Sequence, residues 1–165
     1  MRKGDIVFIQ GNSIISRIIR MFDVDSNGKK GRFSHVAIAI SEKQMIEAEY
    51  NSKVSIVNIC NHPEKISACE VVDLKINKEE RQAIYEESMK FIGRKYDYVQ
   101  IISYILNKLF GFKLINNKKR FICSELVVAS MYQAGLLRGV NYDDVANMTP
   151  NQLYEFIKKH SKNDK

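Results

Sequence analysis

Tryptophan is absent from this chain of 165 residues, which holds only two prolines, three cysteines and three histidines. Three cysteines are too few for a disulfide framework. Cys60 and Cys69 are expected to be reduced, half-buried thiols; the alternative is that they pair in an oxidising compartment. No C-x-x-C or H-x-x-x-H spacing occurs, so we expect no structural zinc site. No apolar run approaches the roughly 20 residues that a membrane-spanning helix needs. The chain also has no internal repeat and no low-complexity linker.

Basic residues outnumber acidic ones, 26 against 19, which gives a net charge of +7. This charge favours anionic surroundings such as a phospholipid surface, nucleic acid or anionic wall polymers. The basic residues form only short clusters, and no basic helix with interleaved aromatic residues resembles a nucleic-acid reader. We therefore expect no nucleic-acid partner.

Length and composition predict one domain. Hydrophobic residues make up 45% of the chain, which is enough for a core. We expect this domain to span residues 1–165, with a core at about 4–158 and a polar tail at 159–165. The first three residues lead into Gly-Asp and a short strand rather than an apolar segment, so no secretory signal is recognised. A cytoplasmic location is expected, unless a signal was removed before residue 1.

The first half of the chain predicts strands and the second half helices, which is an α+β pattern. Runs rich in β-branched residues with short connections predict an antiparallel meander. Its strands are expected at Ile6–Ile9, Ser34–Ile40, Gln44–Glu49, Val54–Ile59 and Glu70–Leu74.

Helix start and stop signals predict the helices. A helix is expected from Asn77, where Glu80 can complete a capping box, to Gly93. An apolar helix is expected at 98–110, after which a Lys/Asn-rich loop leads to a helix over Cys123–Ala134 that stops at Gly135. Thr149-Pro150 predicts the start of the last helix.

Two segments near the N-terminus have more than one interpretation. Isoleucines at helical spacing in residues 14–22, capped by Asn12 or Ser13, predict a helix that packs on the core. Alternatively, its arginines make it a basic amphipathic patch that contacts an anionic surface. The following DVDSNG resembles the start of a calcium loop, but Ser34 stands where the glutamate at the twelfth position is required. We therefore expect no bound metal and no cofactor.

Cys123 is a candidate nucleophile, in the segment Phe121-Ile122-Cys123-Ser124-Glu125-Leu126-Val127. It lies where a helix is predicted to begin, and the helix dipole there favours the negative charge of a thiolate. The apolar residues that follow would anchor this helix in the core. On position alone, a buried structural cysteine is the commoner case.

His35 and Glu47 are the candidate partners of such a thiol. His35 opens an apolar strand after a polar loop and is the best placed of the three histidines to act as a base. Glu47 lies within the next strand, on the face opposite Ile46, where its carboxylate could accept a hydrogen bond from the imidazole. Glu49 shares that face and is the rival. Alternatively, His35 is a structural histidine and both acids are simply exposed.

Five short motifs, taken in order, resemble a known family. They are Gly4-Asp5-Ile6-Val7-Phe8, Ser34-His35-Val36-Ala37-Ile38, Met45-Ile46-Glu47-Ala48, Gly93-Arg94-Lys95-Tyr96-Asp97 and Cys123-Ser124-Glu125-Leu126-Val127. Together they resemble the circularly permuted branch of the NlpC-type papain-like cysteine peptidases, the YiiX-like proteins. The resemblance implies a permuted papain-like fold, in which an antiparallel meander or partial barrel packs against a helical layer that carries the nucleophile.

The resemblance also implies roles for four residues. Cys123 matches the nucleophile, His35 the general base and Glu47 the third member of the triad. Tyr96 matches a tyrosine whose hydroxyl is expected to stabilise the oxyanion. Asp5 looks structural, closing a turn into the first strand.

The resemblance implies a cysteine hydrolase that works through a thioester and acts on the amides of cell-wall-type or related small peptides. A lipid acyltransferase or phospholipase, similar to lecithin:retinol acyltransferase, is the first alternative. That group usually has a second histidine where Glu47 stands, which favours the peptidase side. A non-catalytic binding module of the same fold is the second alternative. The expected partner is therefore a small peptide or an acyl substrate, with weak contact to an anionic membrane as an additional expectation.

Overall fold

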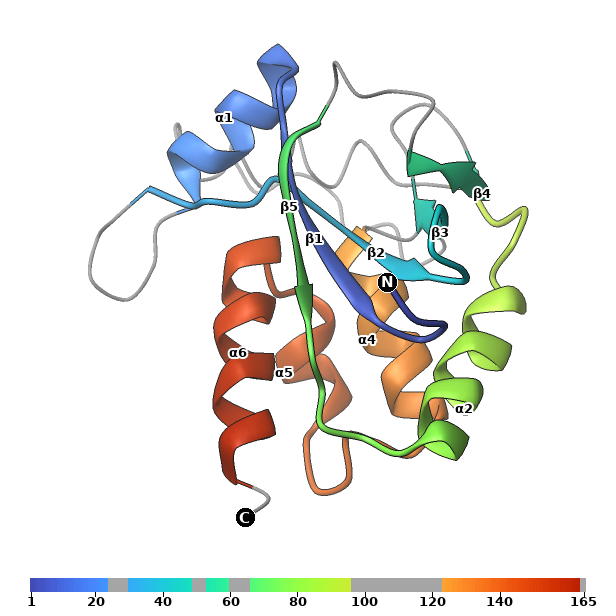
Figure 1. Ribbon diagram of the computed structural model, residues 1–165. Coiled ribbons are helices and arrows are strands. Elements are labelled where there is room, and N and C mark those ends of the chain that lie inside the picture. The colour runs from blue at the N-terminus through green and yellow to red at the C-terminus, as the bar shows by residue number, and fades with distance from the viewer. Residues whose placement is uncertain (24–29, 49–52, 60–65, 96–122, 164–165) are drawn as a thin grey trace.

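The structure is a computed structural model that describes residues 1–23, 30–48, 53–59, 66–95 and 123–163. The described strands form one five-stranded antiparallel sheet in the order β4-β3-β2-β1-β5 (Figure 1). They are β1 (Ile6–Gly11), β2 (His35–Ala39), β3 (Gln44–Ala48), β4 (Val54–Asn58) and β5 (Ile66–Val72). The predicted strands are therefore present, each with slightly different ends.

Strand β5 differs most from the prediction. It begins at Ile66 instead of Glu70, because its ladder with β1 extends to the pair Gly11 and Ile66 beyond a register shift. A simple meander would place β5 next to β4. Instead it lies on the other side of β1, so β1 and β2 occupy the middle of the sheet. Cys69, on this edge strand, is a free thiol, as expected, but it is exposed rather than half-buried.

The helices follow the predicted signals closely. Ser13 caps α1 (Ile14–Phe22), and Asn77 and Glu80 form the complete capping box of α2 (Lys78–Met89). Gly135, with a φ of 75°, follows α4 (Cys123–Gln133). The short helix α5 (Tyr142–Ala146) was not predicted, and α6 (Pro150–Asn163) begins at the expected proline. The predicted helix at 98–110 lies outside the described residues.

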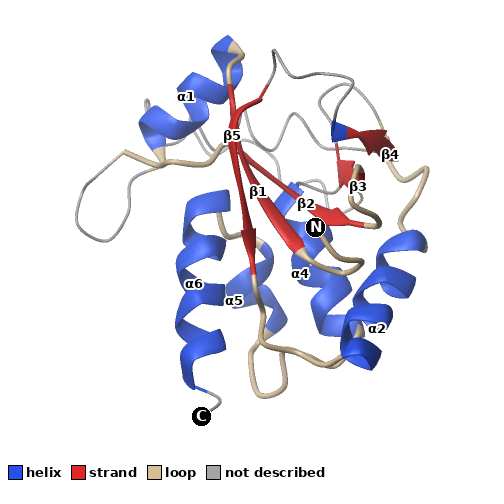
Figure 2. Cartoon of the chain, in the orientation of Figure 1, coloured by secondary structure: helices blue, strands red, loops and turns tan. Residues whose placement is uncertain are grey.

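The core lies between the sheet and helices α2, α4, α5 and α6, which gather in the lower half of the view (Figures 1 and 2). Helix α4 packs against β2, β3, α2 and α5 and contributes Leu126, Val127 and Val128, all fully buried. The opposite sheet face is also buried, around Val7 and Ala37. Burial on both faces explains why the central strands read as continuous apolar runs. None of the described helices is long and apolar enough to cross a membrane.

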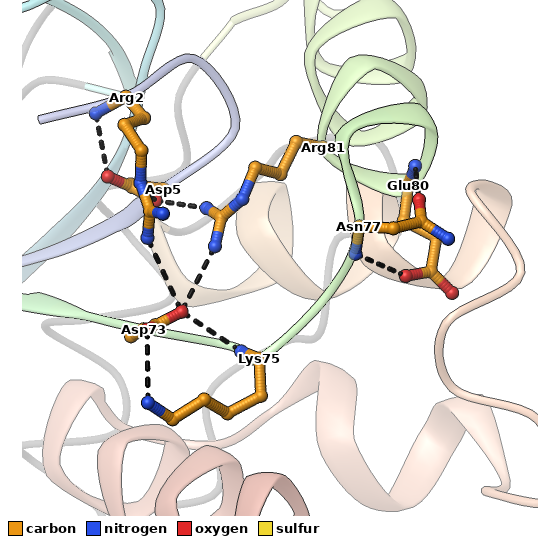
Figure 3. Close-up of polar contacts among 7 residues, drawn as sticks. All are labelled: Arg2, Asp5, Asp73, Lys75, Asn77, Glu80 and Arg81. Atoms are coloured by element: carbon orange, nitrogen blue, oxygen red, sulfur yellow. Dashed lines mark hydrogen bonds and ion pairs between the residues drawn. The ribbon is translucent and has the colours of Figure 1, made fainter.

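An ionic network with a buried Asp5–Arg81 pair at its centre joins the start of β1 to α2 (Figure 3). The Asp5 carboxylate accepts a hydrogen bond from the Arg2 backbone N–H at 2.7 Å and pairs with the Arg81 guanidinium. Arg81 also donates to Asp73 at 3.0 Å. Hydrogen bonds from Lys75, first from its backbone N–H and then from its side chain, lower the pKa of Asp73 to about 2. Asp5 thus closes the turn before β1, as its sequence position predicts.

We expect Arg81→Ala to lower the free energy of unfolding by about 3 kcal/mol, because it removes the buried cation of the Asp5 carboxylate. Only the exposed Arg2, whose Nε lies 3.6 Å from that carboxylate, would remain beside it. Urea denaturation measures this loss. Lys90→Ala is the matched control, because it removes the more exposed Lys90–Glu87 ion pair of the same region and should cost under about 0.5 kcal/mol. Equal losses in the two variants would contradict the structural role of Arg81.

Candidate active site

Helix α4 presents Cys123 as its first residue. Cys123 is a free thiol with 5% of its surface exposed, and the residues behind it are buried from Leu126 to Met131. As the first residue of a helix, it has a backbone N–H with no acceptor inside that helix. The fold therefore holds both the sulfur and an N–H donor at the tip of a rigid, buried element.

Strand β2 presents His35 as its first residue, paired with Ile9 of β1. The preceding residue fixes this strand end, because the Ser34 hydroxyl accepts a hydrogen bond from the Gly11 backbone N–H at 3.0 Å. The His35 side chain is 21% exposed, whereas Val36, immediately after it, is fully buried. The imidazole is thus held by a buried strand and keeps an opening to solvent.

Glu47 reaches the imidazole from the neighbouring strand β3. Its flanking residues Ile46 and Ala48 pack into a different part of the core, so strand alternation turns Glu47 to the opposite face. The carboxylate oxygen Oε2 lies 2.9 Å from Nε2 of His35, and the Glu47 side chain is 11% exposed. The hydrogen bond expected from the sequence is therefore present.

The surroundings of His35 favour its protonated form. Burial alone would lower the pKa of the imidazole, but hydrogen bonds to the Cys123 sulfur and to the Glu47 carboxylate outweigh it. The negative charges of these two partners act in the same direction, and the pKa of His35 is raised well above its usual 6.5. The ring nitrogen that faces Glu47 is Nε2.

The structure therefore brings together three of the four predicted site residues, from three separate elements. A thiol, an imidazole that can hold its proton, and a carboxylate hydrogen-bonded to the imidazole are the groups that a thiol nucleophile and its acid–base partner require. Tyr96, the fourth, lies outside the described residues, and so does Glu49, the rival of Glu47.

Metal ligands are not grouped in the described part of the chain, where no cluster of three or more His, Cys, Asp or Glu side chains occurs. Asp23, the first residue of the calcium-like sequence, is buried and hydrogen-bonded to protein. Its carboxylate accepts from the Thr149 hydroxyl at 2.7 Å and from the Asn151 side chain. The rest of that sequence lies outside the described residues.

Sequence reasoning missed a buried amide that supports the His35 strand. The Oδ1 atom of Asn151 accepts from the backbone N–H groups of Arg32 and Phe33, at 2.7 and 2.8 Å. Its Nδ2 donates to Asp23 and to the Phe33 carbonyl. Asn151 thus holds the chain two residues before His35. No local pattern could reveal contacts between residues more than a hundred positions apart.

Ser124, beside Cys123, is also notable. Its hydroxyl is the one buried side-chain polar atom without a hydrogen-bond partner in the described part of the chain. The sequence singled out the Cys-Ser pair only as a motif. An unpaired buried hydroxyl costs stability.

A cysteine helix that follows the histidine and carboxylate strands defines the class of permuted papain-like proteins, in which the nucleophile comes last along the chain. Comparison of sequences agrees with this. The chain belongs to the permuted papain-like amidase family C92, the YaeF/YiiX family, whose profile matches residues 1–155. The family, the α+β permuted papain-like fold and a general cysteine hydrolase character are therefore established.

Among solved structures, the metalloprotein yiiX from Escherichia coli O157:H7 is similar, with 14% sequence identity and a TM-score of 0.48. The similarity covers 91% of this chain and 93% of that one. No curated protein matches the chain significantly.

The imidazole of His35 should titrate above pH 6.5 in the folded protein. Because the folded pKa is raised, His35 adds stability below the unfolded value of about 6.5, and this stability is lost as the pH rises through the folded pKa. Glu47→Gln removes a negative neighbour and should lower the pKa of His35. An NMR titration measures the pKa of His35 in the wild type and in Glu47→Gln. Glu86→Gln, on the exposed face of α2, is the control. An unchanged His35 pKa in Glu47→Gln would contradict the pairing.

Asn151→Ala should lower the free energy of unfolding by about 3 kcal/mol, because two backbone N–H groups lose their acceptor and the buried Asp23 carboxylate loses one of its donors. Gln82→Ala, which removes an exposed amide hydrogen bond, should change it by under about 0.5 kcal/mol. Combining Asp23→Asn with Asn151→Asp keeps an amide beside a carboxylate and should restore part of the loss. Urea denaturation of these three variants tests this, and a neutral Asn151→Ala would contradict it.

Proposed function

We propose that the protein is a cysteine amidase that hydrolyses the amide bonds of small peptides through a thioester on Cys123. The single observation that supports this most is the position of the His35 imidazole. It is hydrogen-bonded to the Glu47 carboxylate at 2.9 Å, and it lies close enough to Cys123 for that group to raise the pKa of the imidazole. A structural histidine needs one partner, whereas one placed between a thiol and a carboxylate has the contacts of an acid–base catalyst.

Acylation proceeds in two steps. His35 takes the proton of the Cys123 thiol, and the thiolate attacks the carbonyl carbon of the substrate amide to form a C–S bond. The tetrahedral intermediate then collapses as the C–N bond breaks and the imidazolium gives its proton to the leaving amine. The raised pKa of His35 suits this role, because the imidazolium must persist until the amine leaves.

Deacylation reverses the roles. His35 takes a proton from water, and the resulting hydroxide attacks the thioester carbon. The C–S bond breaks, the carboxylic acid is released, and the Cys123 sulfur regains a proton from His35. Throughout, Glu47 accepts a hydrogen bond from Nε2 and so keeps the imidazole in the orientation that faces the sulfur.

The oxyanion of each intermediate needs hydrogen-bond donors. The backbone N–H of Cys123, at the start of α4, is one such donor. The hydroxyl of Tyr96 is the second donor that the resemblance implies.

Small peptides of the cell-wall type are the proposed substrates. The family is described as one of amidases, and the carboxylate of Glu47 stands where acyl-transferring relatives of lipid metabolism usually have a second histidine. Hydrolysis of an acyl lipid is the second candidate, and it is favoured by the exposed isoleucine-rich helix α1. The same three residues would serve an ester, so the substrate is decided outside them.

The proposal predicts that Cys123→Ala abolishes hydrolysis, with at least a ~10³-fold loss in kcat, while the variant unfolds at the same urea concentration as the wild type. The assay is a panel of peptides with γ-glutamyl or D-amino acid linkages alongside a fluorogenic acyl lipid. Cys69→Ala is the matched control, because Cys69 is an exposed thiol on the edge strand, and it should keep full activity.

Two outcomes would contradict the proposal. An unchanged rate in Cys123→Ala would exclude the thiol mechanism. Turnover of the acyl lipid without turnover of any peptide would exclude the amidase and favour the second candidate.

A further inference from the structure

Helix α1 turns apolar side chains outward. Ile14 is 77% exposed and Met21 50% exposed, which makes Ile14 the most exposed large apolar residue in the described part of the chain. Together with the half-buried Ile18 they lie at positions i, i+4 and i+7, so they form one stripe along the helix. The exposed Arg17 flanks this stripe. We call Ile14, Arg17, Ile18 and Met21 the α1 outer face.

Polar contacts hold the inner side of the same helix. Arg20, which a solvated surface helix would direct to water, donates from Nη1 to the Gly11 carbonyl at 3.0 Å. The Ser13 hydroxyl caps the first turn through the Ser16 N–H, and the Gly31 N–H donates to the Arg20 carbonyl at 3.0 Å. The helix is thus attached to the rest of the protein by hydrogen bonds of Arg20, while Ile14 and Met21 stay in water. Burying that surface would be favourable.

The charged residues within α1 itself, Arg17 and Arg20, are both basic. No acidic residue occurs between Asp5 and Asp23, and the segment 30–32, which meets α1 through Gly31, adds the exposed Lys30 to the arginines of the helix. The chain as a whole carries +7. A second copy of this face would meet it with the same charge, so self-association is disfavoured. Apolar side chains flanked by basic ones, with no acid among them, are complementary to an anionic phospholipid surface.

The position of α1 links this face to the reaction centre. The helix follows β1 after two residues, at the strand end where Ile9 pairs with His35 and the Gly11 N–H bonds to Ser34. Figure 1 shows α1 apart from the other helices, at the upper end of the sheet. A partner surface that binds the α1 outer face would therefore also lie near the strand end that carries His35.

We propose that the α1 outer face docks the protein on anionic phospholipid bilayers, with Ile14, Ile18 and Met21 inserted at the headgroup level and Arg17 paired with lipid phosphates. Docking is a property of the surface and does not depend on the chemistry of Cys123. It brings the strand end that carries His35 to the membrane surface, where substrates attached to lipid would be presented.

The test is co-sedimentation of the intact chain with vesicles that contain phosphatidylglycerol and with vesicles of phosphatidylcholine alone. The wild type is expected to bind the anionic vesicles at least about tenfold more tightly, with binding that weakens as salt is added. The double variant Ile14→Glu with Met21→Glu is expected to lose at least about tenfold in affinity. Cys123→Ala should bind as the wild type does, which separates docking from the proposed amidase activity.

Matched controls use the same chemical changes elsewhere. Ile56 and Ile92 are 43% and 40% exposed, so Ile56→Glu with Ile92→Glu adds the same two charges away from α1 and should change the affinity by less than about twofold. Arg17→Gln should reduce the salt dependence, whereas Lys43→Gln, at the turn between β2 and β3, should not. Circular dichroism and urea denaturation confirm that each variant is folded.

Three results would overturn the proposal. The first is equal binding of the wild type to both kinds of vesicle, or to neither. The second is equal loss of affinity in the α1 variant and the Ile56–Ile92 control. The third is a dimer, detected by sedimentation velocity, that the α1 variant abolishes, because that would make a second copy the occupant of this face.

Discussion

The packing of α4 against β2 and β3 is the constraint on which the site depends. It places the first residue of a helix, Cys123, at the strand ends that carry His35 and Glu47. Every residue of α4 from Leu126 to Met131 is buried, so the helix cannot shift without opening the core. The apolar interior therefore brings together three polar groups that are far apart in the sequence, and it fixes their geometry.

Buried polar contacts fix the chain where the core alone would leave it free. Asn151 and Asp23 hold the residues just before His35, and the Asp5–Arg81 pair holds the entry to β1. Such contacts contribute little net stability when complete but are costly to break. Their main effect is therefore to fix where the strand ends lie, and their contribution to the total stability is smaller. The position of His35 depends on these fixed strand ends.

Much of this could be predicted from the sequence, because the signals are local. The Asn77–Glu80 capping box, the Gly135 stop and the apolar run from Val36 mark elements within a few residues of themselves. The place of β5 beside β1 could not be predicted, since it depends on a pairing between segments some sixty residues apart. The support of the His35 strand by Asn151 could not be predicted for the same reason, because it also joins segments far apart in the sequence. Glu47 was predictable because strand alternation alone turns it away from Ile46.

The central claim is that the surroundings of Cys123, rather than its exposure, make it the reactive thiol. Alkylation by iodoacetamide at neutral pH, followed by peptide mass spectrometry, compares it with the exposed Cys69 of the same molecule. The account predicts that Cys123 reacts several-fold faster than Cys69 despite being buried, and that His35→Ala removes this advantage. Reaction of Cys69 first, with Cys123 no faster than in the urea-unfolded chain, would contradict the account.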